Sequence, residues 1–131
     1  KPIVWVLHVA YGWIAAGFCL KGLALLGLTT SSSATHAFTV GGIGLITLGM
    51  MGRVSLGHTG RPLQLPKLTV LAIFVLTLAG VARVAAGFEV FAGAYSLLIN
   101  LSALLWILAF SCFCYNYWPF LLKPRIDGRP G

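Results

Sequence analysis

Residues 3–27 read IVWVLHVAYGWIAAGFCLKGLALLG, an apolar run that carries only two basic side chains, His8 and Lys21. A helix needs about 20 apolar residues to cross the hydrocarbon core of a bilayer, and this run has about 25. The apolar core of a signal peptide is shorter, at about 7–15 residues. The stretch therefore predicts a membrane-spanning helix and sets the class of the whole fold.

The composition of the whole chain agrees with a membrane protein. Of its 131 residues, 59% are hydrophobic and 8% are charged, whereas soluble domains carry about 25% charged residues. The net charge of +7 does not form a nucleic-acid-binding patch, because the basic residues stand dispersed at the ends of apolar runs. We therefore predict an all-α protein in a membrane, with lipid around it and no nucleic-acid partner.

Further apolar runs follow at residues 36–57, 67–87 and 93–121. With 3–27 they predict a four-helix transmembrane bundle over residues 1–122. The segment TTSSSAT is expected to form the first turn, with Thr35 as the cap of the second helix. Pro62 and Pro66 separate the second and third helices, because proline is poor in a helix interior. Residues 123–131 are expected to form a polar, poorly ordered cytoplasmic tail.

The basic residues indicate how the bundle is oriented. With four spans, both termini and the 58–66 loop lie on one side of the membrane, and positively charged loops stay in the cytoplasm. We therefore expect both termini to be cytoplasmic. That side carries seven basic residues and the other side carries two: Lys1, Arg53, Arg61, Lys67, Lys123, Arg125 and Arg129 against Lys21 and Arg83.

The three histidines are the candidate ligands, because ionisable residues inside spans are usually functional and imidazole binds metals and haem iron. Counted along the helices, His8 lies about 8 Å into the membrane from the cytoplasmic side. His58 ends the second helix on that same side, and His36 begins it about 33 Å away. The spacing predicts that His8 and His58 hold one haem between them, and it disfavours a single three-histidine metal centre.

The polar stretch RVSLGHTGRP, residues 53–62, would form the edge of this haem site. Arg53 and Arg61 are predicted to pair with the haem propionates, because arginine pairs bidentately with carboxylates. Gly57 and Gly60 would let the backbone pass close to the ring. The stretch would then be polar because it binds the cofactor.

A second site is suggested on the outer side of the membrane. His36 lies there with Lys21, Arg83 and Glu89, and it would supply half of a metal or haem site whose other ligand comes from another chain or segment. The second helix is also rich in glycine, which favours close helix packing over a flat ligand on its surface.

Each of these residues also has a purely structural interpretation. His58 would then only form a hydrogen bond at a helix end, His8 would lie among interfacial aromatic residues, and His36 would only begin a helix. For Arg53 and Arg83 the corresponding alternative is that their long side chains reach to the membrane interface. Both interpretations stay open from the residues alone.

Residues 36–63, HAFTVGGIGLITLGMMGRVSLGHTGRPL, resemble the signature region of the NnrS family. The resemblance extends from WVLHVAYGW at the first span to KPRIDGRPG at the end, so it covers nearly the whole chain. NnrS proteins are polytopic bacterial membrane proteins that contain haem and copper and are linked to the nitric-oxide response. The resemblance implies haem b, copper as a second metal, and the bacterial inner membrane. The residues at matching motif positions are His8, His36, His58, Arg53 and Arg61.

Family members commonly have about three times as many spans as this chain. We therefore expect this chain to correspond to the C-terminal third of such a protein, or to a short member that acts as a subunit. In either case we expect a homo-oligomer or a larger membrane complex.

Three functions are compatible with the sequence. The first is a haem-binding membrane protein or subunit of the nitric-oxide response or of electron transfer. The second is a structural accessory subunit of a larger, respiratory-type membrane complex, and the third is a quinone-binding module. The chain has one glutamate, one aspartate and no pairing of a nucleophile with a base. We therefore predict no catalytic side chains, and the sequence leaves open whether the chain is part of an enzyme.

Overall fold

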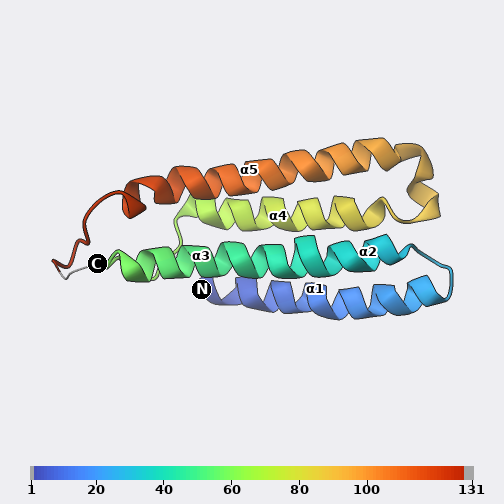
Figure 1. Cartoon of the computed structure of the whole chain (residues 1–131), viewed down its shortest axis with the longest axis horizontal. Coiled ribbons are helices and arrows are strands. Elements are labelled where there is room, and N and C mark those ends of the chain that lie inside the picture. Colours follow the sequence, from blue (N-terminus) through green and yellow to red (C-terminus); the bar gives the residue numbers. More distant parts are fainter. Residues whose placement is uncertain (1, 129–131) are drawn as a thin grey trace.

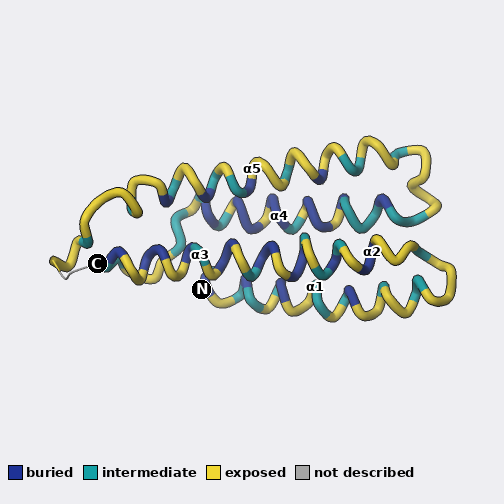
Figure 2. The backbone as a smooth tube through the Cα atoms, in the orientation of Figure 1, coloured by how far each residue is buried: buried dark blue, intermediate teal, exposed yellow. Residues whose placement is uncertain are grey.

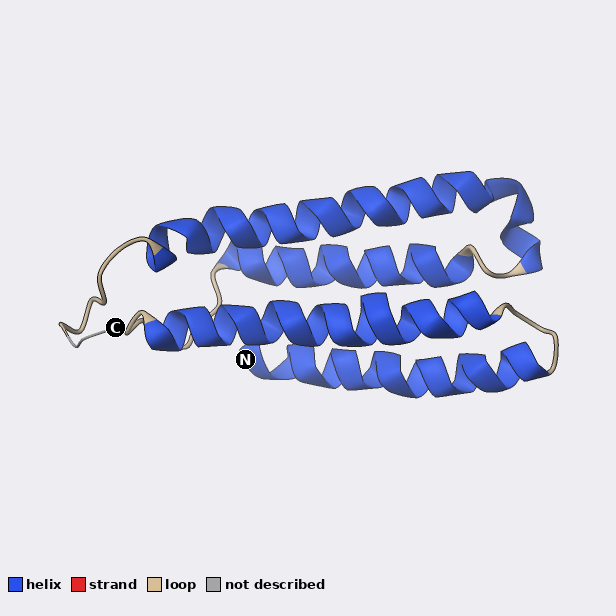
Figure 3. Ribbon diagram, in the orientation of Figure 1, coloured by secondary structure: helices blue, strands red, loops and turns tan. Residues whose placement is uncertain are grey.

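The computed structural model describes residues 2–128, which form a bundle of long antiparallel helices without strands (Figures 1 and 3). Helix α2 (Ser31–His36), the π-helical segment η1 (Ala37–Ile43) and α3 (Gly44–His58) run on as one rod. The other elements are α1 (Pro2–Leu25), α4 (Lys67–Ala85), the 3-10 helix η2 (Glu89–Ala94) and α5 (Tyr95–Leu121). The predicted all-α four-helix fold is confirmed.

Four helices are long and apolar enough to cross a membrane: Pro2–Leu25, Ser31–His58, Lys67–Ala85 and Glu89–Leu121. Their outer faces are exposed in the isolated chain, and the buried residues lie along the inside of the bundle (Figure 2). Large apolar side chains such as Leu25, Leu97 and Leu104 point outward. Lipid tails solvate such side chains as well as a protein core does, so this surface suits a bilayer.

The second helix begins earlier than the sequence predicted. Its N-cap is Thr30, which has an extended backbone and accepts a hydrogen bond from the Ser33 amide at 3.3 Å. Thr35, the predicted cap, lies inside the helix, and its hydroxyl donates to the Ser31 carbonyl at 3.0 Å. Serine and threonine cap helices because their side-chain oxygens satisfy free amides. Here Thr30 caps the helix, five residues before the predicted cap, and the turn is correspondingly shorter.

The register of α1 against η1 and α3 is set by glycines that face large side chains. A Cβ atom placed on Gly49 would lie 2.8 Å from Val6 Cγ1, and one placed on Gly42 would lie 3.0 Å from Ile14 Cγ1. An added methyl group would force Val6 and Ile14 to shift, so both positions favour glycine. The glycines of the second helix therefore allow α1 to pack closely against η1 and α3. In this register Val6 lies opposite Gly49.

The bundle has two distinct ends. The motif end holds residues 53–66 and 122–128, and both ends of the described chain lie there (Figure 1). The far end holds the turns at residues 26–30 and 86–94. Two residues of the predicted charge asymmetry, Lys1 and Arg129, lie outside the described residues. The others divide between the ends as the sequence predicted: Arg53, Arg61, Lys67, Lys123 and Arg125 at the motif end, and Lys21 and Arg83 toward the far end.

Candidate cofactor pocket

The helix register places the three histidines at three different depths. Because Val6 stands opposite Gly49, His8 is level with about residue 47, and His58 lies about 16 Å farther toward the motif end at 1.5 Å per residue. His36 lies about 16 Å from the level of His8 in the opposite direction, toward the far end. The structure therefore does not bring His8 and His58 together, and the predicted clamp between them is not formed within this chain. The reason is that α3 extends well past the start of α1 (Figure 1).

One cavity at the motif end gathers three of the predicted cofactor-binding residues. His58, Arg53 and Gly57 all line a cavity of about 420 Å³. Its apolar wall consists of three side chains that are 40–47% exposed: Met50, Val54 and Leu63. Arg125 is the remaining residue that lines the cavity. A Cβ atom on Gly57 would meet only Leu63 Cδ2, at 4.0 Å, so the wall beside His58 is open. The cavity joins an imidazole and two guanidinium groups to an apolar surface.

Arg61 and Gly60 do not line this cavity. The Arg61 guanidinium lies over the Phe120 ring, 4.3 Å from its centre, in a cation–π contact. Gly60 has a φ of +72°, and an added Cβ atom would lie 2.8 Å from the carboxyl carbon of Asp127. Both residues therefore shape the turn after α3, which holds His58 in place.

The C-terminal segment is fixed to that same turn. The Arg125 guanidinium forms a two-point ion pair with Asp127, at 2.9 and 2.6 Å, and its Nη1 donates to the His58 carbonyl at 3.1 Å. The Ile126 amide donates to the Thr59 carbonyl at 3.3 Å. The hydrogen bonds with Asp127 raise the pKa of Arg125 above its ordinary value. Residues 125–127 thus have a defined place, although the sequence predicted a poorly ordered tail.

Arg125 is the one charged residue of the pocket that was not predicted from the sequence as a site residue. A signal for it was present, because Asp127 is the only aspartate of the chain and lies two residues after Arg125. An arginine and an aspartate at this spacing can pair and so order a short segment.

His8 and His36 share a local geometry that suits ligand binding. The Nδ1 atom of His36 lies 2.7 Å from the Ser32 carbonyl oxygen, and that of His8 lies 3.1 Å from the Val4 carbonyl oxygen. When Nδ1–H donates to such a carbonyl, the lone pair of Nε2 is left for a metal or a hydrogen-bond donor. His8 is exposed halfway along the bundle, and His36 borders a separate cavity of about 630 Å³.

The side chains that line the pocket at the motif end are those that haem requires. Among residues 2–128, no three side chains of histidine, cysteine, aspartate or glutamate form a group that could hold a metal ion. A copper site made of three such ligands is therefore not formed within these residues. Haem requires an imidazole for its iron, cations for its propionates and an apolar surface for its ring, and the pocket offers all three.

The fold and the pocket define a class of protein: a bundle of helices long and apolar enough to span a membrane, with an imidazole and two guanidinium groups at one end. A family model described as NnrS protein matches residues 1–125, so the chain belongs to the NnrS family. The resemblance of residues 36–63 is thereby confirmed. No curated protein and no solved structure matches the chain.

Proposed function

We propose that this chain binds haem b at the motif end and serves the nitric-oxide response or electron transfer in the inner membrane. The observation that carries the proposal is the cavity that joins His58 to Arg53 and Arg125 beside an apolar wall. Membership of the NnrS family supports the same assignment. His58 would ligate the iron, and Arg53 would bind a propionate.

When bound, haem supplies an iron that takes up a diatomic ligand or exchanges an electron. The chain contributes positioning and charge. Arg53 has no acidic partner within residues 2–128, so its charge is free for a propionate. Arg125 donates to the His58 carbonyl and so holds the end of α3 in one conformation. Met50, Val54 and Leu63 would cover part of the ring and keep water from it.

The test of this proposal is the haem content of the purified chain. After expression with sufficient haem supply, the chain in mild detergent is expected to show a Soret band and to carry about one haem per chain, because the pocket offers one imidazole. A folded chain that stays free of haem even after reconstitution would favour the accessory structural subunit instead.

We also propose that the motif end faces the cytoplasm, because five of the seven described basic residues lie there. In a background without Cys19, Cys112 and Cys114, a cysteine at Leu28 in the far turn is expected to react with a membrane-impermeant maleimide in intact cells. A cysteine at Lys123 is expected to react only after lysis. The reverse labelling pattern would show that the motif end faces away from the cytoplasm and would contradict the proposed orientation.

A third part of the proposal is that α1 packs against another chain, as a homo-oligomer or within a larger complex. His8 is exposed halfway along the bundle, and a polar side chain at that depth normally faces protein. One turn further, Gly12 has nothing within 4 Å of a Cβ position, so a partner helix can approach closely.

The partner surface is tested with a single cysteine at Gly12 in the cysteine-free background. Oxidation in membranes is expected to give a disulfide-linked dimer if the partner is a second copy, or a cross-link to another protein if it is not. A matched cysteine at Leu104, on an exposed face of α5, should give neither. Equal behaviour of both positions would contradict the proposal.

A further inference from the structure

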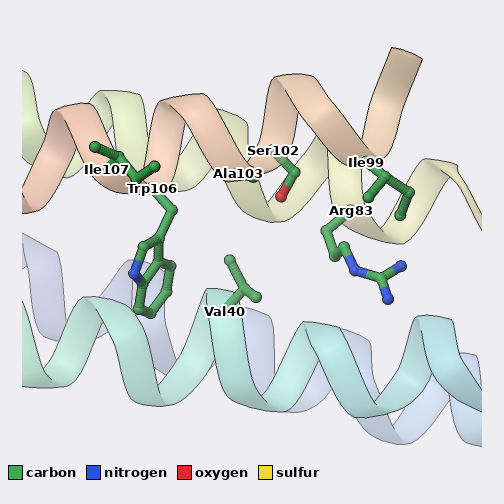
Figure 4. A pocket seen from close by; sticks show the side chains of 7 residues that line it. All are labelled: Val40, Arg83, Ile99, Ser102, Ala103, Trp106 and Ile107. Carbon is green, nitrogen blue, oxygen red and sulfur yellow. The ribbon is translucent and has the colours of Figure 1, made fainter. Parts of the chain in front are cut away.

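A groove between α5 and the rod formed by η1 and α3 is not used by the proposed haem site. It consists of two adjoining cavities, of about 630 and 330 Å³, that share Val40 and Trp106 in their walls. Trp106 extends from α5 toward the rod (Figure 4), and its ring packs where a side chain on Gly44 would lie, 3.0 Å from that Cβ position. The Phe110 ring lies beside it at a tilt of 35°, with ring centres 4.8 Å apart.

Two polar groups border the groove toward the far end. His36 lines the larger cavity and Arg83 lines the smaller one. The Ser33 hydroxyl donates to the Val84 carbonyl at 3.1 Å, which sets α2 beside the end of α4. His36 lies three residues after Ser33, and Arg83 lies one residue before Val84. His36 and Arg83 therefore occupy the same layer of the bundle. Figure 4 shows the Arg83 side chain extending from α4 toward the rod.

Arg83 needs a partner that the described chain does not supply. It is half-buried, and among residues 2–128 it forms no ion pair and no hydrogen bond. An arginine near an apolar groove is stabilised by an oxygen acceptor, since charge-assisted hydrogen bonds are the stronger kind. His36 complements it, because with Nδ1–H donated to the Ser32 carbonyl its Nε2 accepts a hydrogen bond.

We propose that this groove binds a lipid-soluble quinone or its quinol. The ring would lie between Trp106 and the layer that holds Arg83 and His36, with Trp106 as its aromatic neighbour. Arg83 would donate a hydrogen bond to one ring oxygen, and His36 Nε2 would accept a hydrogen bond from a hydroxyl group of the reduced form. The isoprenoid tail would leave along exposed apolar side chains such as Ile43 and Ile107. A flat uncharged ring suits the groove better than a phosphate, because its walls away from Arg83 and His36 are mainly apolar and include aromatic rings.

The experiment is a titration of the full chain in detergent with decylubiquinone, followed by tryptophan fluorescence, because quinones quench nearby indoles. We expect saturable quenching that is largely lost in Trp106→Phe, although Trp5, Trp13 and Trp118 remain. Arg83→Gln is expected to weaken binding about tenfold or more, because it removes a charge-assisted hydrogen bond. Lys21→Gln, a cation of the far end outside the groove, is the matched control and should bind like the wild type.

A second variant keeps the test decisive if Arg83→Gln folds poorly. Ala103→Phe leaves Arg83 in place and fills the smaller cavity with a ring, so it should also weaken binding. All these variants should keep their full haem content, which separates this site from the one at the motif end. Quenching that does not saturate, wild-type affinity in both Arg83→Gln and Ala103→Phe, or equal displacement by an added phospholipid would overturn the proposal.

Discussion

Gly41→Ala is expected to destabilise the bundle by about 3 kcal/mol or more, at the upper end of the range for overpacked cores. A methyl group on Gly41 would overlap the ring of Trp13. That ring has little room to move aside, because its other edge lies against Gly80, 3.1 Å from the position that a Cβ atom would take there. Trp13 is therefore held between two glycines on two helices, η1 and α4.

The measurement is unfolding of the chain in mixed micelles by increasing SDS, followed by helix content. Gly22→Ala is the matched control, because nothing lies within 4 Å of its Cβ position, and it should change the free energy of unfolding by less than about 1 kcal/mol. Combining Gly41→Ala with Trp13→Leu should restore part of the lost stability, since the two residues are in contact. Equal effects of Gly41→Ala and Gly22→Ala would contradict the packing described for Trp13.

Prediction of the helices succeeded because each is an apolar run long enough to span a bilayer, a property of composition alone. The register of the helices was beyond the sequence, because it depends on which glycine meets which large side chain. Val6 fits Gly49 and Ile14 fits Gly42, but the sequence offers many such pairings. A depth counted from the start of each helix therefore placed His8 near the membrane edge, whereas the register places it midway.

The candidate pocket was predictable in part from helical periodicity. Met50, Arg53, Val54, Gly57 and His58 follow the spacing of one face of a helix, and all five line the cavity. The remaining two lining residues come from the loop after α3 and from the C-terminal segment. Their positions depend on tertiary hydrogen bonds and an ion pair, which a pattern of apolar and polar residues does not encode.

His58→Ala is expected to reduce haem content to less than about a tenth of the wild-type level. Even residues that only support a metal ligand typically change affinity 10–100-fold when replaced, and His58 is the only histidine that lines the pocket. Arg53→Gln should lower the affinity for haem less, because apolar contacts and Arg125 remain. Adding imidazole to His58→Gly should restore part of the haem, which a merely misfolded variant would not do.

Haem content per chain, compared among the separate alanine variants of His58, His8 and His36, tests the central claim most directly. All three side chains are at least partly exposed, so each variant should fold, and the SDS titration verifies this. Only His58→Ala is expected to lose the haem, because His8 and His36 each lie about 16 Å from the level of the nearest other histidine. Full haem with an unchanged spectrum in His58→Ala, or loss of haem in His36→Ala alone, would contradict the claim.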